Sequence, residues 1–207
     1  MRRAYARIAW GLGFALIDFT INSFDLFPDV IGYGLLAAGL SKLGPRNGRY
    51  RLARNAAVVQ LVLSVLALLG WTQPGFSLTG GGTPSVNMLG LSAATLVVEL
   101  TMLYGLCEGI RLDALKRGRN RLARLARLRW HFAFAAGAAM LFLLPFQMNR
   151  SLREMLPIAL ALAVCTIVSE LLVLGLARQA GREIAGNPGG GGGGTDEDAG
   201  SAIDMRV

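Results

Sequence analysis

The sequence contains a single histidine, His131, and only two cysteines, Cys107 and Cys165, which lie far apart in apolar stretches. It therefore has no CxxC pair, no zinc-ligand spacing and no disulfide framework. The metalloprotease motif HExxH, the nucleophile motif GxSxG and the Walker phosphate loop are missing, and no GxGxxG follows a strand. These absences exclude the common catalytic and nucleotide sites. We therefore expect a non-enzymatic protein without a metal or cofactor.

Charge is also scarce, because 16% of the residues are charged and 53% are hydrophobic, whereas about a quarter of a soluble domain is charged. The net charge of +8 does not indicate nucleic acid as a partner. No aromatic residue interrupts the basic segment 111–129 to stack on a base. Its arginines instead separate long apolar runs, which is typical of a membrane protein.

Six apolar segments can be marked, each near the roughly 17–25 residues that cross a bilayer as a helix. They are about Ile8–Phe24, Leu26–Leu43, Ala56–Trp71, Met88–Ile110, Trp130–Met148 and Leu156–Ala177. The sequence therefore predicts an all-α integral membrane bundle of about six transmembrane helices.

The basic residues alternate between the connections of these segments. They gather at the N-terminus, in 44–55, in 111–129 and after the sixth segment, and the other three connections carry few. Lys and Arg concentrate in cytoplasmic loops, so both termini are predicted inside a bacterial cytoplasmic membrane. The transmembrane domain is predicted over 1–183, and the Gly-rich, acidic tail 184–207 is expected to be disordered.

The basic segment 111–129 has two interpretations. A break at Gly118 followed by a helix would place Leu122, Leu125 and Ala126 on one face, suited to lie in the membrane interface. Alternatively, the segment is a solvated loop that only obeys the orientation rule. In either case we expect anionic lipid headgroups as partners, bound by Arg119, Arg121, Arg124, Arg127 and Arg129.

Four acidic residues interrupt the apolar segments, namely Asp18, Glu99, Glu108 and Glu170. An ionisable group inside a bilayer costs about 2.5–3.5 kcal/mol on insertion scales and marks a functional site by default. On a continuous helix Asp18, Asn22 and Asp25 would share one face. These acids and Asn22 are therefore candidates for a proton or cation path.

The stretch "DLFPDVIGY" joins the first two segments. Proline is typical of the first turn of a helix, so Pro28 predicts a helix start here. Asp25 could cap that helix, and the negative charge of Asp29 would interact favourably with the positive end of the helix dipole. The stretch resembles a pattern of small bacterial polytopic membrane proteins of unknown function, carried by Asp25, Pro28, Asp29, Ile31, Gly32, Tyr33 and Gly39. That resemblance implies a membrane protein and supplies no catalytic residue.

The second helix is predicted to pack tightly between its neighbours through two small-residue faces, one of Gly34, Ala38 and Ser41 and one of Gly32 and Gly39. A re-entrant segment that enters only half of the membrane is the alternative.

Two functions stay open. The favoured hypothesis is an interaction or regulatory role, with another membrane protein or a second copy of the chain as partner. The alternative is a small proton- or cation-coupled transporter that uses the intramembrane carboxylates. A membrane-embedded enzyme is the least favoured, since histidine is so scarce.

Overall fold

Six α-helices dominate the computed structural model, which describes residues 2–16, 20–21, 24–25, 29–69, 86–148 and 152–184, with side chains in 2–16, 29–69, 86–146 and 157–184. The helices are α1 (Arg2–Leu16), α2 (Asp29–Leu43), α3 (Gly48–Leu68), α4 (Val86–Lys116), α5 (Asn120–Leu143) and α6 (Leu152–Glu183). Short 3-10 turns cover Gly44–Arg46 and Leu144–Met148. The tail 185–207 lies outside the described residues.

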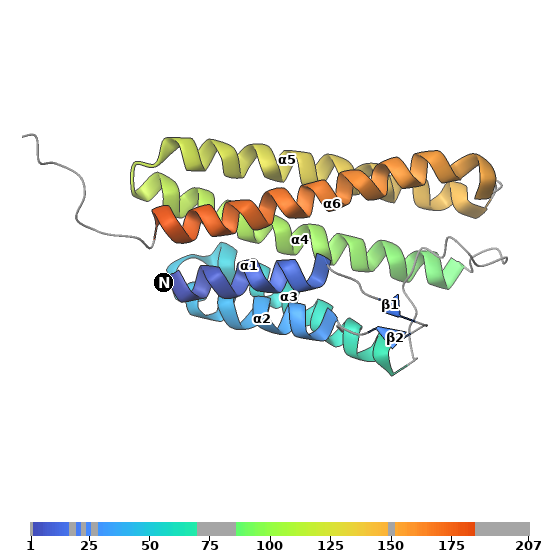
Figure 1. The fold of residues 1–207 in the computed structure, drawn as a ribbon, viewed down its shortest axis with the longest axis horizontal. Coiled ribbons are helices and arrows are strands. Elements are labelled where there is room, and N and C mark those ends of the chain that lie inside the picture. The colour runs from blue at the N-terminus through green and yellow to red at the C-terminus, as the bar shows by residue number, and fades with distance from the viewer. Residues whose placement is uncertain are drawn as a thin grey trace, which may run out of the picture.

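The helices form a closed ring in chain order. Each packs against the next along the chain, and α6 returns to pack against α1 (Figure 1). Neighbouring helices run in opposite directions, so α2, α4 and α6 are parallel to one another. In addition, α4 and α6 touch each other. Side chains of α2, α4 and α6 can therefore meet inside the ring.

The predicted helical membrane bundle is confirmed, but the count of six spans is wrong. Within the described residues, four helical stretches are long and apolar enough to cross a membrane: Gly48–Leu68, Val86–Lys116, Asn120–Phe146 and Pro157–Glu183. Helices α1 and α2 have 15 residues each. At 1.5 Å per residue they are about 22 Å long, shorter than a hydrocarbon core of about 30 Å.

The chain between α1 and α2 corrects the interpretation of the acidic stripe. Strands β1 (Thr20–Ile21) and β2 (Phe24–Asp25) pair antiparallel, with Thr20 opposite Asp25. Asp25 lies in an extended strand, which does not keep the spacing of a helix, so it does not belong to a helical stripe. Asp25 is also not the cap of α2, which begins four residues later at Asp29. Asp18, Asn22 and Pro28 lie outside the described residues.

Most of the predicted basic loops are helical. In 44–55, only the Gly44–Arg46 turn and Asn47 precede α3, and the Asn47 side chain caps that helix by accepting from the Arg49 N–H at 3.1 Å. In 111–129, α4 continues to Lys116 and α5 begins at Asn120. The chain reverses between them at Gly118, which has a φ of +68° that glycine adopts without strain.

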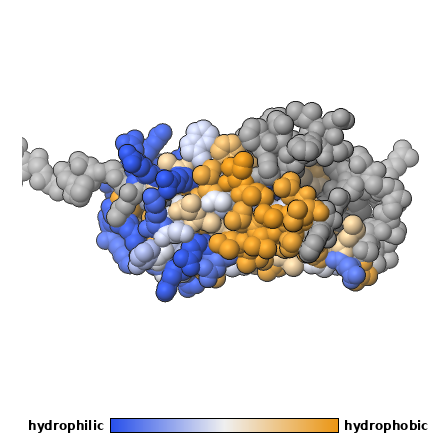
Figure 2. Space-filling model, turned by 90° about the horizontal axis from the view of Figure 1, so that it is seen from below, coloured by the Kyte–Doolittle hydropathy of each residue, from blue (hydrophilic) through white to orange (hydrophobic). Residues whose placement is uncertain are grey.

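The interface-helix interpretation is also wrong. Leu122 and Ala126 of α5 are fully buried, and Leu125 packs against the same core. The predicted apolar face therefore contacts protein instead of lipid. Basic residues lie in the helix ends and turns at one end of the bundle, here called the basic end: Arg2, Arg3, Arg46, Lys116, Arg117, Arg119 and Arg182. Figure 2 shows hydrophilic side chains at one end of the molecule, next to an apolar band.

Helices α1 and α2 approach so closely that their backbones touch. A Cβ on Gly32 would lie 2.8 Å from the Ala15 nitrogen, and one on Gly11 would lie 2.7 Å from the Gly32 oxygen. This contact confirms the predicted face of Gly32 and Gly39, where a Cβ on Gly39 would lie 3.0 Å from the Ala4 oxygen. The other predicted face lies elsewhere on α2. Gly34 has no atom within 4 Å of a Cβ, and Ala38 and Ser41 are exposed. The pair is thus joined through Gly32, not through Gly34.

We predict that Gly32→Ala lowers the free energy of unfolding by about 1–3 kcal/mol, the usual cost of overpacking. The atoms it meets are backbone atoms that cannot rotate away. Gly34→Ala, two residues along the same helix, is the matched control and should be neutral or gain up to about 1 kcal/mol of helix propensity. Thermal unfolding in detergent measures both, and equal melting temperatures would contradict the α1–α2 contact.

Candidate functional site

Two of the acids that the sequence singled out meet inside the ring. The side chains of Glu99 of α4 and Glu170 of α6 lie within hydrogen-bonding reach of each other. Both side chains are half-buried. The two helices run parallel, so the similar segments "VVELTMLYG" and "VSELLVLG" bring their glutamates together.

The contact between the two carboxyl groups requires a proton. An ionised carboxylate only accepts hydrogen bonds, whereas a protonated carboxyl group also donates one. Glu99 and Glu170 can therefore bond directly only when at least one of them is protonated. The two carboxyl groups are therefore placed so that they could share a proton.

Helix α2 adds two more groups. Tyr33 interacts electrostatically with Asp29, Glu99 and Glu170, and Asp29 also interacts with Glu170. Asp29 begins α2, about 21 Å along the helix from Leu43, while Glu170 lies about 20 Å from the end of α6 at Glu183. The shortness of α2 thus brings its first turn to the depth of the glutamates, not to the outer surface where we expected it.

Further polar side chains lie near the pair. Ser169 and Gln60 are 2% exposed. Ser169 Oγ donates to the Thr166 carbonyl at 2.8 Å, and Gln60 Nε2 donates to the Thr95 carbonyl, one helical turn before Glu99, at 3.1 Å. Gln60 is not among the predicted residues, because it is not ionisable and, unlike Asn22, shares no helical spacing with a predicted acid. The sequence feature that points to Gln60 is its position as the only amide in the apolar run "VVQLVLSVLALL".

The charged neighbours of the pair are acidic. In the described part of the chain, no lysine or arginine interacts with Glu99 or Glu170. The described residues also contain no group of three His, Cys, Asp or Glu side chains that could hold a metal ion. Two neighbouring carboxyl groups can hold a proton or a monovalent positive charge.

A second polar cluster closes the basic end. The Tyr5 and Tyr50 hydroxyls are 3.0 Å apart, and the Tyr50 hydroxyl donates to Asp113 Oδ2 at 3.3 Å. Asp113 is 5% exposed and lies 3.6 Å from the Arg46 guanidinium. Burial raises the pKa of the Tyr5 phenol above its ordinary value, and the hydrogen bond with Tyr50 opposes that rise. Asp113 was missed because we assigned it to a loop.

The remaining predicted residues are dispersed. Glu108 forms an ion pair with Arg111 at 2.5 Å, one helical turn away, and takes no part in the Glu99–Glu170 pair. Arg129 is half-buried and donates to the Leu172 carbonyl of α6 at 2.7 Å, so it joins two helices. The other predicted lipid contacts are exposed, namely Arg119, Arg121, Arg124 and Arg127.

A scan against protein-family models and searches of curated proteins and of solved structures found no match to this chain. The resemblance carried by "DLFPDVIGY" therefore stays a prediction.

We predict that Tyr50→Phe lowers the free energy of unfolding by about 1–3 kcal/mol, because it leaves the buried Asp113 without one donor. Tyr104→Phe is the control, since the Tyr104 hydroxyl makes no hydrogen bond within the described part of the chain. Chemical denaturation in detergent compares the two. A loss as large in Tyr104→Phe would contradict the assigned role of the cluster.

Proposed function

We propose that the chain is a small proton-coupled transporter whose proton-binding site is the Glu99–Glu170 pair. The observation that carries this proposal is the direct carboxyl–carboxyl contact between two helices that can cross a membrane. Unpaired acids, each bonded to a separate hydroxyl or carbonyl, would instead have favoured a structural role. Ionisable residues that face a bundle interior commonly form proton relays in transporters.

The chemistry of the pair favours a cation as the transported solute. Loss of the shared proton leaves two carboxylates that repel each other, with acidic Asp29 nearby and no basic group of the described residues among their interactions. A positive charge from outside the protein is then needed to hold α4 against α6. A proton and a cation would therefore compete for one site, and this competition is the basis of exchange.

The packing supports access to the site from the end opposite the basic end. The buried residues of α4 begin at Leu100, and every side chain from Val86 to Glu99 is half-buried or exposed. Glu99 thus lies where the close-packed core ends. Between the acid pair and the basic end lies the buried cluster of Tyr5, Tyr50 and Asp113, which leaves that side closed.

We predict that protein-containing vesicles exchange internal protons for external cations, and that Glu99→Gln and Glu170→Gln lower the rate to that of protein-free vesicles. The amide cannot bind a cation as a carboxylate does, nor release a proton. An internal pH-sensitive dye measures the exchange for a panel of alkali and organic ammonium ions. Glu108→Gln is the matched control and should keep the exchange.

A carbodiimide, which reacts with protonated carboxyl groups, provides an independent measurement. Mass spectrometry should find the adduct on Glu99 or Glu170 in the unsubstituted protein. Exchange that is unchanged in both glutamine variants, or the lack of any adduct on either residue, would contradict the proposal.

The basic end fits the cytoplasmic side of a bacterial cytoplasmic membrane, by the excess of Lys and Arg in cytoplasmic connections. The exposed side chains of Arg119, Arg121, Arg124 and Arg127 support contact with anionic headgroups there, each contributing about 1 kcal/mol.

An association role is the second candidate, favoured by the outward-facing stripe of Gly34, Ala38 and Ser41 on α2. Small residues at this spacing let two membrane helices approach closely, and no described atom lies within 4 Å of a Cβ on Gly34. A second copy of the chain is the simplest partner.

We predict that Gly34→Leu abolishes self-association, because the larger side chain holds the second helix away. Chemical crosslinking in vesicles measures this, with Gly90→Leu as the control, since Gly90 also faces open space. Equal dimer yields in both variants would contradict the association role.

A further inference from the structure

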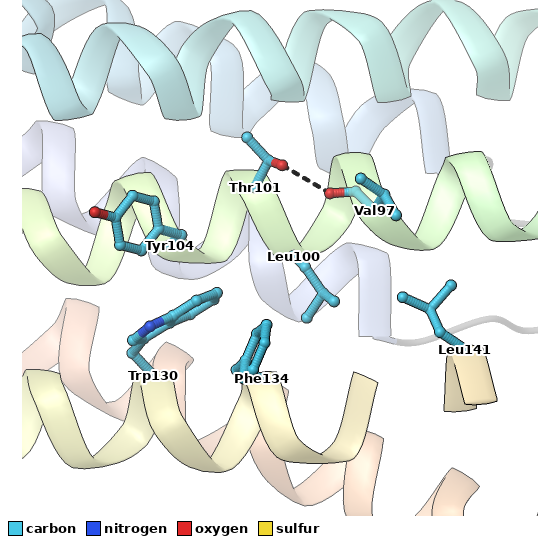
Figure 3. Close-up of a pocket in the computed structure, with 7 residues that line it drawn as sticks. All are labelled: Val97, Leu100, Thr101, Tyr104, Trp130, Phe134 and Leu141. Carbon is cyan, nitrogen blue, oxygen red and sulfur yellow. Dashed lines mark hydrogen bonds between the residues drawn. The ribbon is translucent and has the colours of Figure 1, made fainter. Parts of the chain in front are cut away.

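An apolar groove runs along the outer side of the ring between α4 and α5, away from the acid pair. Its volume is about 350 Å³, and it is lined by Val97, Leu100, Thr101 and Tyr104 of α4 and by Trp130 and Phe134 of α5, with Leu141 at one end (Figure 3). Val97 and Phe134 are about half exposed, so the groove opens outward.

The floor of the groove is shaped by a glycine. A Cβ on Gly137 of α5 would lie 2.7 Å from Leu100 Cδ2, so Leu100 lies directly against the α5 backbone. The lining contains two hydroxyls. That of Thr101 donates to the Val97 carbonyl at 2.8 Å, and that of Tyr104 lies at the end of the groove nearest Arg49. The remaining lining is apolar apart from the Trp130 N–H and suits an apolar occupant.

The length of the groove matches one leaflet of a membrane. From Trp130 to Leu141 the helix rises about 16 Å, while half of a hydrocarbon core of about 30 Å is about 15 Å. Both helices of the groove are long and apolar enough to cross a membrane. One acyl chain of a lipid in the leaflet at the basic end fits this dimension.

The end of the groove nearest the basic end carries a positive charge. The rings of Tyr104 and Trp130 lie 5.0 Å apart, and the Arg49 guanidinium carbon lies 5.4 Å from the centre of the Tyr104 ring. Arg49 is exposed, and neither of the two ion pairs in the described part of the chain includes it. An anion bound to Arg49 would therefore lie directly at the end of the apolar groove.

We propose that this groove binds one acyl chain of an anionic phospholipid whose phosphate contacts Arg49. An arginine fork suits a phosphate better than any neutral group, and Trp130 lies between the polar and apolar parts of such a ligand, as an indole prefers. A second copy of a chain with a net charge of +8 is the poorer match to a groove that ends in an arginine.

Fluorescence quenching of Trp130 tests this proposal. The full chain with Trp10→Phe and Trp71→Phe keeps Trp130 as its only tryptophan. It is placed in vesicles of one fixed mixture of phosphatidylglycerol and phosphatidylcholine, with brominated acyl chains on one lipid or on the other. The charge and composition of the membrane are therefore the same in both samples, and only the position of the quencher differs.

We expect brominated phosphatidylglycerol to associate with Trp130 about fivefold more strongly than brominated phosphatidylcholine, the preference that one nearby cationic side chain provides. Arg49→Gln should lower this ratio to about one. Arg51→Gln, an exposed arginine on the same helix, should leave it unchanged. The proposal is overturned if the two lipids quench equally in the protein that retains Arg49. It is also overturned if neither lipid quenches, as when a second copy covers the groove.

Discussion

A carboxyl group inside a hydrocarbon layer must share its hydrogen or bind a counter-charge, because no water is present to solvate it. Glu99 can satisfy this constraint with Glu170, across the contact between α4 and α6. The two acids meet because α4 and α6 run parallel and touch. Replacing either one leaves the other without its partner, so the pair acts as one unit and not as two independent acids.

The short first two helices determine what surrounds this pair. If α2 were long enough to cross the membrane, Asp29 at its start would lie at the surface opposite the basic end. Because α2 has only 15 residues, Asp29 lies at the depth of Glu170. Backbone contact at Gly11 and Gly32 fixes α2 against α1 and thereby places Tyr33 towards α4 and α6. Gly32, which belongs to the turn motif, is therefore needed for the packing that positions the site, although glycine has no side chain that could take part in its chemistry.

The sequence predicted the helical class and the segregation of basic residues at one end, because both depend on local composition. It did not predict the length of α1 and α2. The apolar run from Ile8 to Phe24 includes residues that the structure places in a strand, and hydropathy does not distinguish the two. Glu99 and Glu170 were identified by their cost in a membrane, but their pairing joins segments distant in the sequence. Asp113 was hidden because helix α4 extends past the apolar run into the basic segment.

Helix α4 contributes to both the inside and the outside of the ring, with α6 on the inner side and α5 on the outer side. On the inner side, α4 presents Glu99 to Glu170 of α6, and neither acid has a basic partner among the described residues. On the outer side, α4 presents Val97, Leu100, Thr101 and Tyr104 beside α5, and Arg49 at the end of this apolar groove forms no ion pair within the described part of the chain. Glu99 and Leu100 are consecutive, so a shift of α4 that opens the acid pair also changes the floor of the groove. An occupant of the groove would therefore stabilise one position of α4, which physically connects the surrounding lipid to the proposed proton-binding site.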